Sequence, residues 1–94
     1  ADEQKKYVRE ADEKFEKLLA VIQSNEISQY KTQQDFLKAF GEPILKKESN
    51  LPKEYAQRWL YRYCEKMQGS EKVYLYFDAQ GTLLKWEHKA ADTQ

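Results

Sequence analysis

The sequence predicts an α+β domain in which two N-terminal helices pack on one face of a three- to four-stranded antiparallel meander sheet. Two observations lead to this fold class. Apolar residues recur every three or four positions in the first half of the chain and alternate every second position in the second half. The length of 94 residues provides for one hydrophobic core, so residues 1–94 are expected to form a single two-layer domain.

The first predicted element is an amphipathic helix over residues 3–22. Its apolar face consists of Tyr7, Ala11, Phe15, Leu18 and Ile22, with Val8 and Leu19 beside them. Such a helix is only marginally stable alone. We therefore expect it to lie on a surface, which is either its own sheet or another subunit. Ser24, Asn25 and Ser28 interrupt the pattern, and Ile27 and Tyr30 are expected to hold this connection against the core.

A second, shorter helix is predicted over residues 32–40. Thr32 and Asp35 have the spacing of a capping box, and the apolar face that follows consists of Phe36, Leu37 and Phe40. Gly41 lies where a left-handed C-terminal cap belongs, and Pro43 prevents the helix from continuing. The glycine is thus explained by backbone conformation and does not indicate a phosphate-binding loop.

Four strands are predicted over residues 44–48, 55–65, 72–78 and 82–88. Gln68, Gly69 and Ser70 suit the turn of one hairpin, and the segment from Asp78 to Gly81 suits a turn closed by a glycine with positive φ. The small polar residues 89–94 are expected to fray.

Each long strand has one apolar and one mixed side, as expected of a sheet covered on one face only. The core side is predicted to carry Tyr55, Trp59, Tyr61, Tyr63, Val73, Leu75 and Phe77. The mixed side is predicted to carry Ala56, Arg58, Leu60, Arg62, Cys64, Tyr74 and Tyr76.

The residues do not indicate an enzyme. The chain has one histidine, His88, and one cysteine, Cys64. A catalytic pair of the two on neighbouring strands is conceivable, but a strand cysteine is ordinarily an apolar filler. One cysteine cannot form an intrachain disulfide or a thiolate cluster. Because the largest group of carboxylates lies among lysines on the first helix, which is typical of a solvated face, we expect no catalytic residues, no cofactor and no metal.

The mixed side of the sheet is the predicted binding surface, formed by Arg58, Arg62, Tyr74 and Tyr76, with Lys72 nearby. Interleaved basic and aromatic groups resemble sheets that stack single-stranded bases. Cross-strand contacts between tyrosine and arginine also stabilise a sheet with no ligand. Sixteen basic and sixteen acidic residues cancel, which disfavours nucleic acid. A protein partner is therefore the first expectation, because tyrosine and arginine are enriched at binding hot spots, and an anionic lipid headgroup is the second.

Several segments together resemble the SmpA/OmlA (BamE-like) small outer-membrane lipoproteins. The resemblance lies in Ile27 to Gln34, in Ala39-Phe-Gly-Glu-Pro-Ile44, in Trp59-Leu-Tyr61 and in Phe77-Asp-Ala-Gln-Gly-Thr-Leu83, in the order of that family. Tyr30 and Lys31 stand where the family has Gly and Met. The long charged first helix is extra, and the lipid-bearing cysteine is not in this chain. The layered fold is also similar to that of the β-lactamase inhibitory proteins, which act by binding.

The resemblance implies a periplasmic accessory protein in outer-membrane protein assembly or envelope integrity, tethered through a lipid anchor outside this chain. Its members contact a barrel-assembly partner or anionic lipid. No apolar run approaches the roughly 20 residues that span a bilayer, so a membrane is expected to be reached only through such an anchor. The alternative hypothesis is a cytoplasmic module that binds single-stranded nucleic acid on the same aromatic and basic face.

Overall fold

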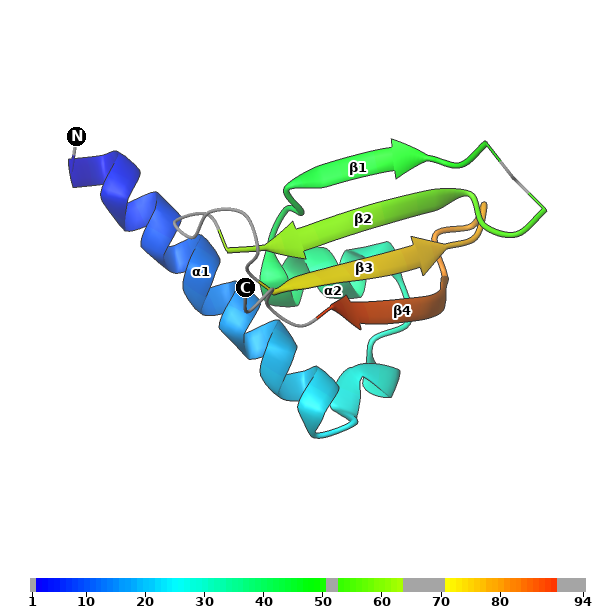
Figure 1. Ribbon diagram of the computed structural model, residues 1–94, viewed down its shortest axis with the longest axis horizontal. Coiled ribbons are helices and arrows are strands. Elements are labelled where there is room, and N and C mark those ends of the chain that lie inside the picture. Colours follow the sequence, from blue (N-terminus) through cyan, green and yellow to red (C-terminus); the bar gives the residue numbers. More distant parts are fainter. Residues whose placement is uncertain (1, 51–52, 64–70, 90–94) are drawn as a thin grey trace.

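The computed structural model describes residues 2–50, 53–63 and 71–89. It contains the helices α1 (Asp2–Gln23) and α2 (Gln33–Phe40), a short 3-10 helix η1 (Glu26–Gln29), and the strands β1 (Leu45–Glu48), β2 (Gln57–Arg62), β3 (Lys72–Phe77) and β4 (Leu83–Lys89). Helices precede a four-stranded antiparallel sheet, which confirms the predicted α+β fold class (Figure 1).

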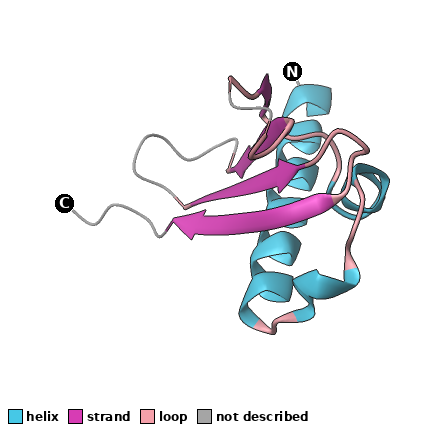
Figure 2. Ribbon diagram, turned by 90° about the vertical axis from the view of Figure 1, so that its right-hand side faces the viewer, coloured by secondary structure: helices cyan, strands magenta, loops and turns pink. Residues whose placement is uncertain are grey.

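The four strands lie in the sheet in their order along the chain, β1-β2-β3-β4, and each pair is antiparallel. Both long helices lie on the same side of the strands (Figure 2). The described residues therefore form two layers, and among them no helix lies on the other face of the sheet. We call this uncovered side the outer face and the side under the helices the inner face. Figure 1 looks onto the outer face, with α2 behind the sheet.

Helix α2 begins as the sequence predicts. The Thr32 side chain accepts a hydrogen bond from the backbone N–H of Asp35, and the Asp35 carboxylate accepts one from the backbone N–H of Thr32. This capping box lowers the pKa of Asp35, chiefly through backbone hydrogen bonds from Lys31 and Thr32. Gly41 ends the helix with φ 76 and ψ −167. That ψ lies outside the left-handed helical region predicted for it, in a region that essentially only glycine occupies.

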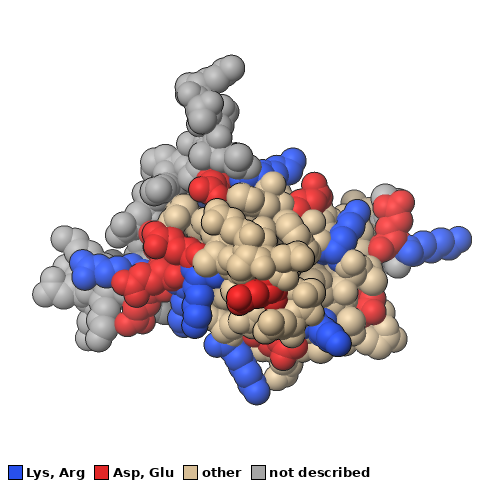
Figure 3. All heavy atoms as spheres, turned by 90° about the horizontal axis from the view of Figure 1, so that it is seen from below, with Lys and Arg blue, Asp and Glu red and all other residues tan. Residues whose placement is uncertain are grey.

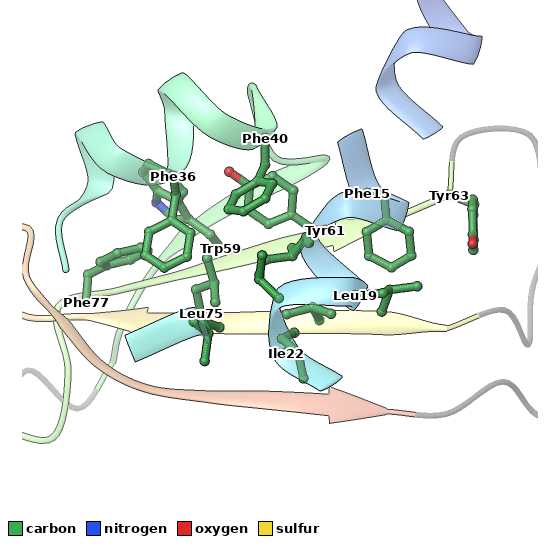
Figure 4. Packing of buried hydrophobic residues seen from close by; sticks show 14 residues of the cluster. Phe15, Leu19, Ile22, Phe36, Phe40, Trp59, Tyr61, Tyr63, Leu75 and Phe77 are labelled. Carbon is green, nitrogen blue, oxygen red and sulfur yellow. The ribbon is translucent and has the colours of Figure 1, made fainter. Parts of the chain in front are cut away.

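The core fills the space between the helices and the inner face. Phe36 and Phe40 of α2 point at the strands beside Trp59 and Phe77, while Phe15 of α1 faces Tyr63 (Figure 4). The Phe36 and Phe77 rings meet edge to face with centroids 5.8 Å apart, and the Trp59 and Phe77 centroids are 4.8 Å apart. The structure confirms the inner-face burial predicted for Trp59, Tyr61, Tyr63, Val73, Leu75 and Phe77.

The connection between the helices is partly regular. It forms η1, which the sequence pattern did not indicate. Ile27 is buried in the core, and the Tyr30 ring packs against Phe36 and Phe40, so the predicted anchoring by these two residues is confirmed. Asn25 has a left-handed φ of 65, a conformation that asparagine tolerates better than most residues.

The N-terminal end of α2 is joined to the start of β4. The backbone N–H of Gln33 donates to the Gly81 carbonyl over 2.9 Å, and the N–H of Leu83 donates to the Lys31 carbonyl over 2.7 Å. Gly81 itself closes the predicted turn with φ 83, and its N–H donates to the Asp78 carbonyl. These contacts cover one end of the β4 edge.

Two predictions about the strands are wrong. Tyr55 was assigned to the inner face, but β2 begins only at Gln57, so the strict alternation does not extend back to it. Its ring instead meets Tyr76 edge to face, with centroids 5.0 Å apart, on the outer side. Lys89, assigned to the fraying tail, belongs to β4. Cys64, the predicted turn at residues 68–70 and the tail beyond Lys89 lie outside the described residues.

Candidate binding surface

Strand register brings the outer-face side chains into three rows across the sheet. Directly opposite residues share a face, so the pairing defines each row. One row runs through Lys47, Arg58, Tyr76 and Lys85. The next runs through Leu45, Leu60, Tyr74 and Glu87. The third runs through Arg62, Lys72 and Lys89.

This face is strongly cationic, although the whole chain is neutral. Six of the residues in the three rows are basic, and Glu87 is their one carboxylate. In the row formed by Arg62, Lys72 and Lys89, which we call the cationic row, three cations stand opposite one another on adjacent strands. Like charges placed directly opposite destabilise a sheet. The placement of these three cations is therefore not explained by their contribution to the stability of the sheet.

Elsewhere the two signs are mixed. On the side of the molecule where β4 and the end of α1 lie, acidic and basic side chains surround an uncharged area (Figure 3). His88, on the inner side of β4, lies 2.8 Å from the Glu71 carboxylate through Nε2. The mixed charges on this side contrast with the rows of the outer face.

The predicted site residues do not all have the same environment. Arg58 and Tyr74 are half-buried neighbours, with the guanidinium carbon 5.1 Å from the centroid of the tyrosine ring. Arg62 lies in the cationic row, and its Nη1 donates to the Tyr63 carbonyl over 3.0 Å. Tyr76 is only 7% exposed, so the expectation that it presents its ring to a partner is wrong.

Tyr76 is buried because three neighbours enclose it. The Tyr55 ring lies against it, the Lys85 ammonium lies 4.8 Å from its ring centroid, and its hydroxyl donates to the Glu87 carboxylate. Burial, followed by the hydrogen bond to Glu87, raises the pKa of Tyr76. The tyrosine therefore works as a small second core on the outer face, which holds the cations around it in place.

Sequence reasoning missed four basic or aromatic members of this surface, namely Lys47, Tyr55, Lys85 and Lys89. Alternation within one strand assigns faces, but only the register between strands shows which side chains gather in a row. The lysines of β1 and β4 were therefore not connected with Arg58 and Arg62. The visible signal was Lys85 on the predicted strand over residues 82–88, with Lys89 directly after that strand and an even number of residues from Lys85.

The described residues show neither a metal centre nor a membrane span. No group of three or more His, Cys, Asp or Glu side chains within residues 2–50, 53–63 and 71–89 is placed to hold a metal ion. In the same ranges no helix is long and apolar enough to cross a membrane. The proposed pairing of Cys64 with His88 is not addressed, because Cys64 is outside these ranges.

Comparison with known proteins supplies no relative. No family model matches the chain, and neither a curated protein nor a solved structure is significantly similar to it.

Proposed function

We propose that this protein is a non-enzymatic binding module that presents the outer face of its sheet to an acidic partner protein. The observation that carries the proposal is the cationic row of Arg62, Lys72 and Lys89, which lies opposite in register across three strands. Such a concentration of one charge attracts and orients a partner of the opposite charge.

Contacts on this face favour a protein over single-stranded nucleic acid. Base stacking needs a ring with an open surface. Tyr76 is buried, and the Tyr74 ring is occupied by Arg58 and by the Lys89 ammonium 5.9 Å from its centroid. The charges point to a partner, while the rings serve as supports for the cations.

The resemblance to small outer-membrane lipoproteins extends the proposal to compartment and role. In that reading the protein acts on the periplasmic side of a bacterial envelope, as an accessory in outer-membrane protein assembly or envelope integrity. The coding sequence upstream of Ala1 provides a direct test. A leader that ends in a lipobox cysteine supports a lipid tether, and an upstream sequence without any export signal contradicts the periplasmic assignment.

Affinity capture from envelope extracts tests the binding role. The outer-face variant used as bait combines Arg62→Gln, Lys72→Gln and Lys89→Gln. Its control combines Lys17→Gln, Lys31→Gln and Lys38→Gln, which removes the same charge from exposed positions elsewhere. Proteins retained by the native chain and by the control at low salt, but lost from the outer-face variant, would be the expected result. Purified candidates must then bind directly, through acidic surfaces and with salt-dependent affinity. Equal retention by both variants contradicts the proposal.

Oligonucleotide binding distinguishes the proposed protein-binding function from the alternative of single-stranded nucleic-acid binding. Short single-stranded DNA and RNA should bind the native chain no better than a blocked polyglutamate peptide of the same charge. Tight, aromatic-dependent oligonucleotide binding that Tyr74→Ala abolishes would favour the nucleic-acid function instead.

A further inference from the structure

A shallow pocket opens at the other end of the outer face from the cationic row. It has a volume of about 250 Å³ and is lined by Lys47, Glu48, Asn50, Tyr55 and Arg58. This volume is below the range of about 300–1,000 Å³ that is usual for drug-sized ligands. The pocket therefore suits a single side chain better than a nucleotide or a sugar.

Four of the five residues that line the pocket, Lys47, Asn50, Tyr55 and Arg58, carry hydrogen-bond donors. Arg58 supplies a planar guanidinium that pairs with a carboxylate through two parallel hydrogen bonds, and Lys47 stands directly opposite it on β1. Asn50 and Tyr55, which also line the pocket, carry an amide and a hydroxyl group. Together these side chains offer more hydrogen bonds than one acidic group needs.

The charge of the pocket selects the kind of anion. Lys47 and Arg58 carry two positive charges, and Glu48 carries one negative charge. The net charge of +1 on these three side chains matches the single negative charge of a carboxylate. A phosphate monoester carries a charge of about −1.5 to −2 at neutral pH. That charge exceeds the net positive charge of the pocket, and the phosphate would lie close to the Glu48 carboxylate.

The pocket is held in shape before any ligand arrives. The Tyr55 ring rests edge to face on the buried Tyr76 ring, and the Arg58 guanidinium lies over the Tyr74 ring. Side chains that are already ordered lose less conformational freedom on binding. The aromatic contacts thus explain why tyrosines accompany the cations on this face.

We propose that this pocket is a carboxylate-binding subsite that receives one Asp or Glu side chain of the acidic partner. This inference rests on the proposed function, since it names the chemistry by which that partner is recognised. The subsite and the cationic row lie at opposite ends of the outer face, which allows them to be tested separately.

The probe is a blocked tetraglutamate peptide, added to isotope-labelled protein and followed by the shifts of backbone amide signals. Shifts at Lys47, Asn50, Tyr55 and Arg58 are expected to saturate together. Arg58→Gln should weaken the peptide's affinity about tenfold, because it removes a hydrogen bond to a charged group. Lys47→Gln should weaken it about threefold, and Lys38→Gln, on the far side of the molecule, should have no effect.

Glu48→Gln gives a result in the opposite direction. Removal of its negative charge should increase the affinity of the pocket for the peptide, and should increase its affinity for inorganic phosphate by a larger factor. The carboxylate assignment is overturned if the native protein binds inorganic phosphate more tightly than tetraglutamate. It is also overturned if a tetraglutamine peptide binds as tightly as tetraglutamate.

The same spectra separate this inference from the proposed function. Saturable shifts confined to Arg62, Lys72 and Lys89 would overturn the subsite and leave the acidic-partner proposal standing. Shifts at neither end would contradict both. Shifts at the pocket that Arg58→Gln removes, with the cationic row unaffected, support the subsite and locate the principal contact away from the row.

Discussion

The two faces of the sheet are built by alternate residues of the same strands, yet they have opposite roles. On β3, the inward side chains Val73, Leu75 and Phe77 are 0% exposed and pack under the helices. Their outward neighbours Lys72 and Tyr74 are half-buried among cations. The inner face provides the free energy of folding through apolar burial, whereas the outer face carries charge that folding does not need. Stability and the proposed binding can therefore be altered independently within one strand.

The largest expected contrast lies between Phe77→Ala and Tyr74→Ala. Phe77 contacts both Phe36 and Trp59, so its removal leaves a cavity and should lower the free energy of unfolding by about 3–5 kcal/mol. Tyr74 loses cation–π contacts on a partly solvated face, which should cost about 1 kcal/mol. Urea unfolding at neutral pH measures both changes. Similar losses of unfolding free energy in the two variants would show that the outer face stabilises the fold as much as the core does.

Alkaline pH should weaken the inner face through Tyr61. Burial first, and the Glu42 carboxylate second, raise the pKa of Tyr61, whose hydroxyl donates to the Gly41 carbonyl over 2.8 Å. Unfolded tyrosine ionises near pH 10, so this stabilisation is complete below about pH 10 and is lost as the pH rises above it.

Tyr61→Phe tests this dependence on pH. At neutral pH the variant should be about 1 kcal/mol less stable, because the hydrogen bond is lost. Above about pH 10 the gap to the native protein should narrow, since phenylalanine does not titrate. Unfolding midpoints across this pH range measure the gap. Parallel curves at all pH values would contradict the assignment to Tyr61.

Tyr76→Phe tests the small second core of the outer face. The change removes the hydrogen bond to Glu87 and keeps the ring contact with Tyr55. A loss of up to about 1 kcal/mol in the free energy of unfolding is expected. The pocket beside Tyr55 should keep its affinity for the tetraglutamate peptide. A variant with native stability but a weakened pocket would assign Tyr76 to binding instead.

The smallest effect on stability is expected for the cationic row. Replacement of Arg62, Lys72 and Lys89 by glutamine should change the free energy of unfolding by no more than about 0.5 kcal/mol per position. At low salt the sign should be stabilising, because like charges that face each other are removed. The matched changes at Lys17, Lys31 and Lys38 should not show this salt-dependent gain. A marked loss of stability would mean that the row is structural.

Much of the fold followed from local patterns, because each pattern has a local physical cause. Thr32 and Asp35 cap α2 through their own side chains, and Gly81 closes a turn that requires positive φ. Alternation placed Trp59 and Leu75 on the inner face correctly. Errors arose where contacts with a neighbour distant in sequence determine the conformation of a residue. Tyr55 turns outward to meet Tyr76, and Gly41 adopts a ψ that the helix end alone does not dictate.

The candidate site was less predictable than the fold for the same reason. Arg58 and Tyr74 were recognised from their strands, but the three rows depend on register, which sequence periodicity does not specify. The burial of Tyr76 requires Tyr55 and Lys85, which arrive from outside β3. Gln57 illustrates the point within the inner layer. Its Oε1 accepts from both the Trp59 indole and the Gln33 amide, a bridge between sheet and helix that no motif indicated.

The charged edge of the sheet has a consequence for how copies of the chain meet. β1 is an edge strand whose four residues are all exposed, and three of them are Lys46, Lys47 and Glu48. In a symmetric antiparallel pairing of two chains through this edge, opposite residues share a face, so a pairing centred on Lys46 or on Lys47 would place that lysine opposite its own copy. That repulsion discourages ribbon-like stacking of sheets. The protein can therefore leave Leu45 half exposed beside the outer face without its chains joining edge to edge.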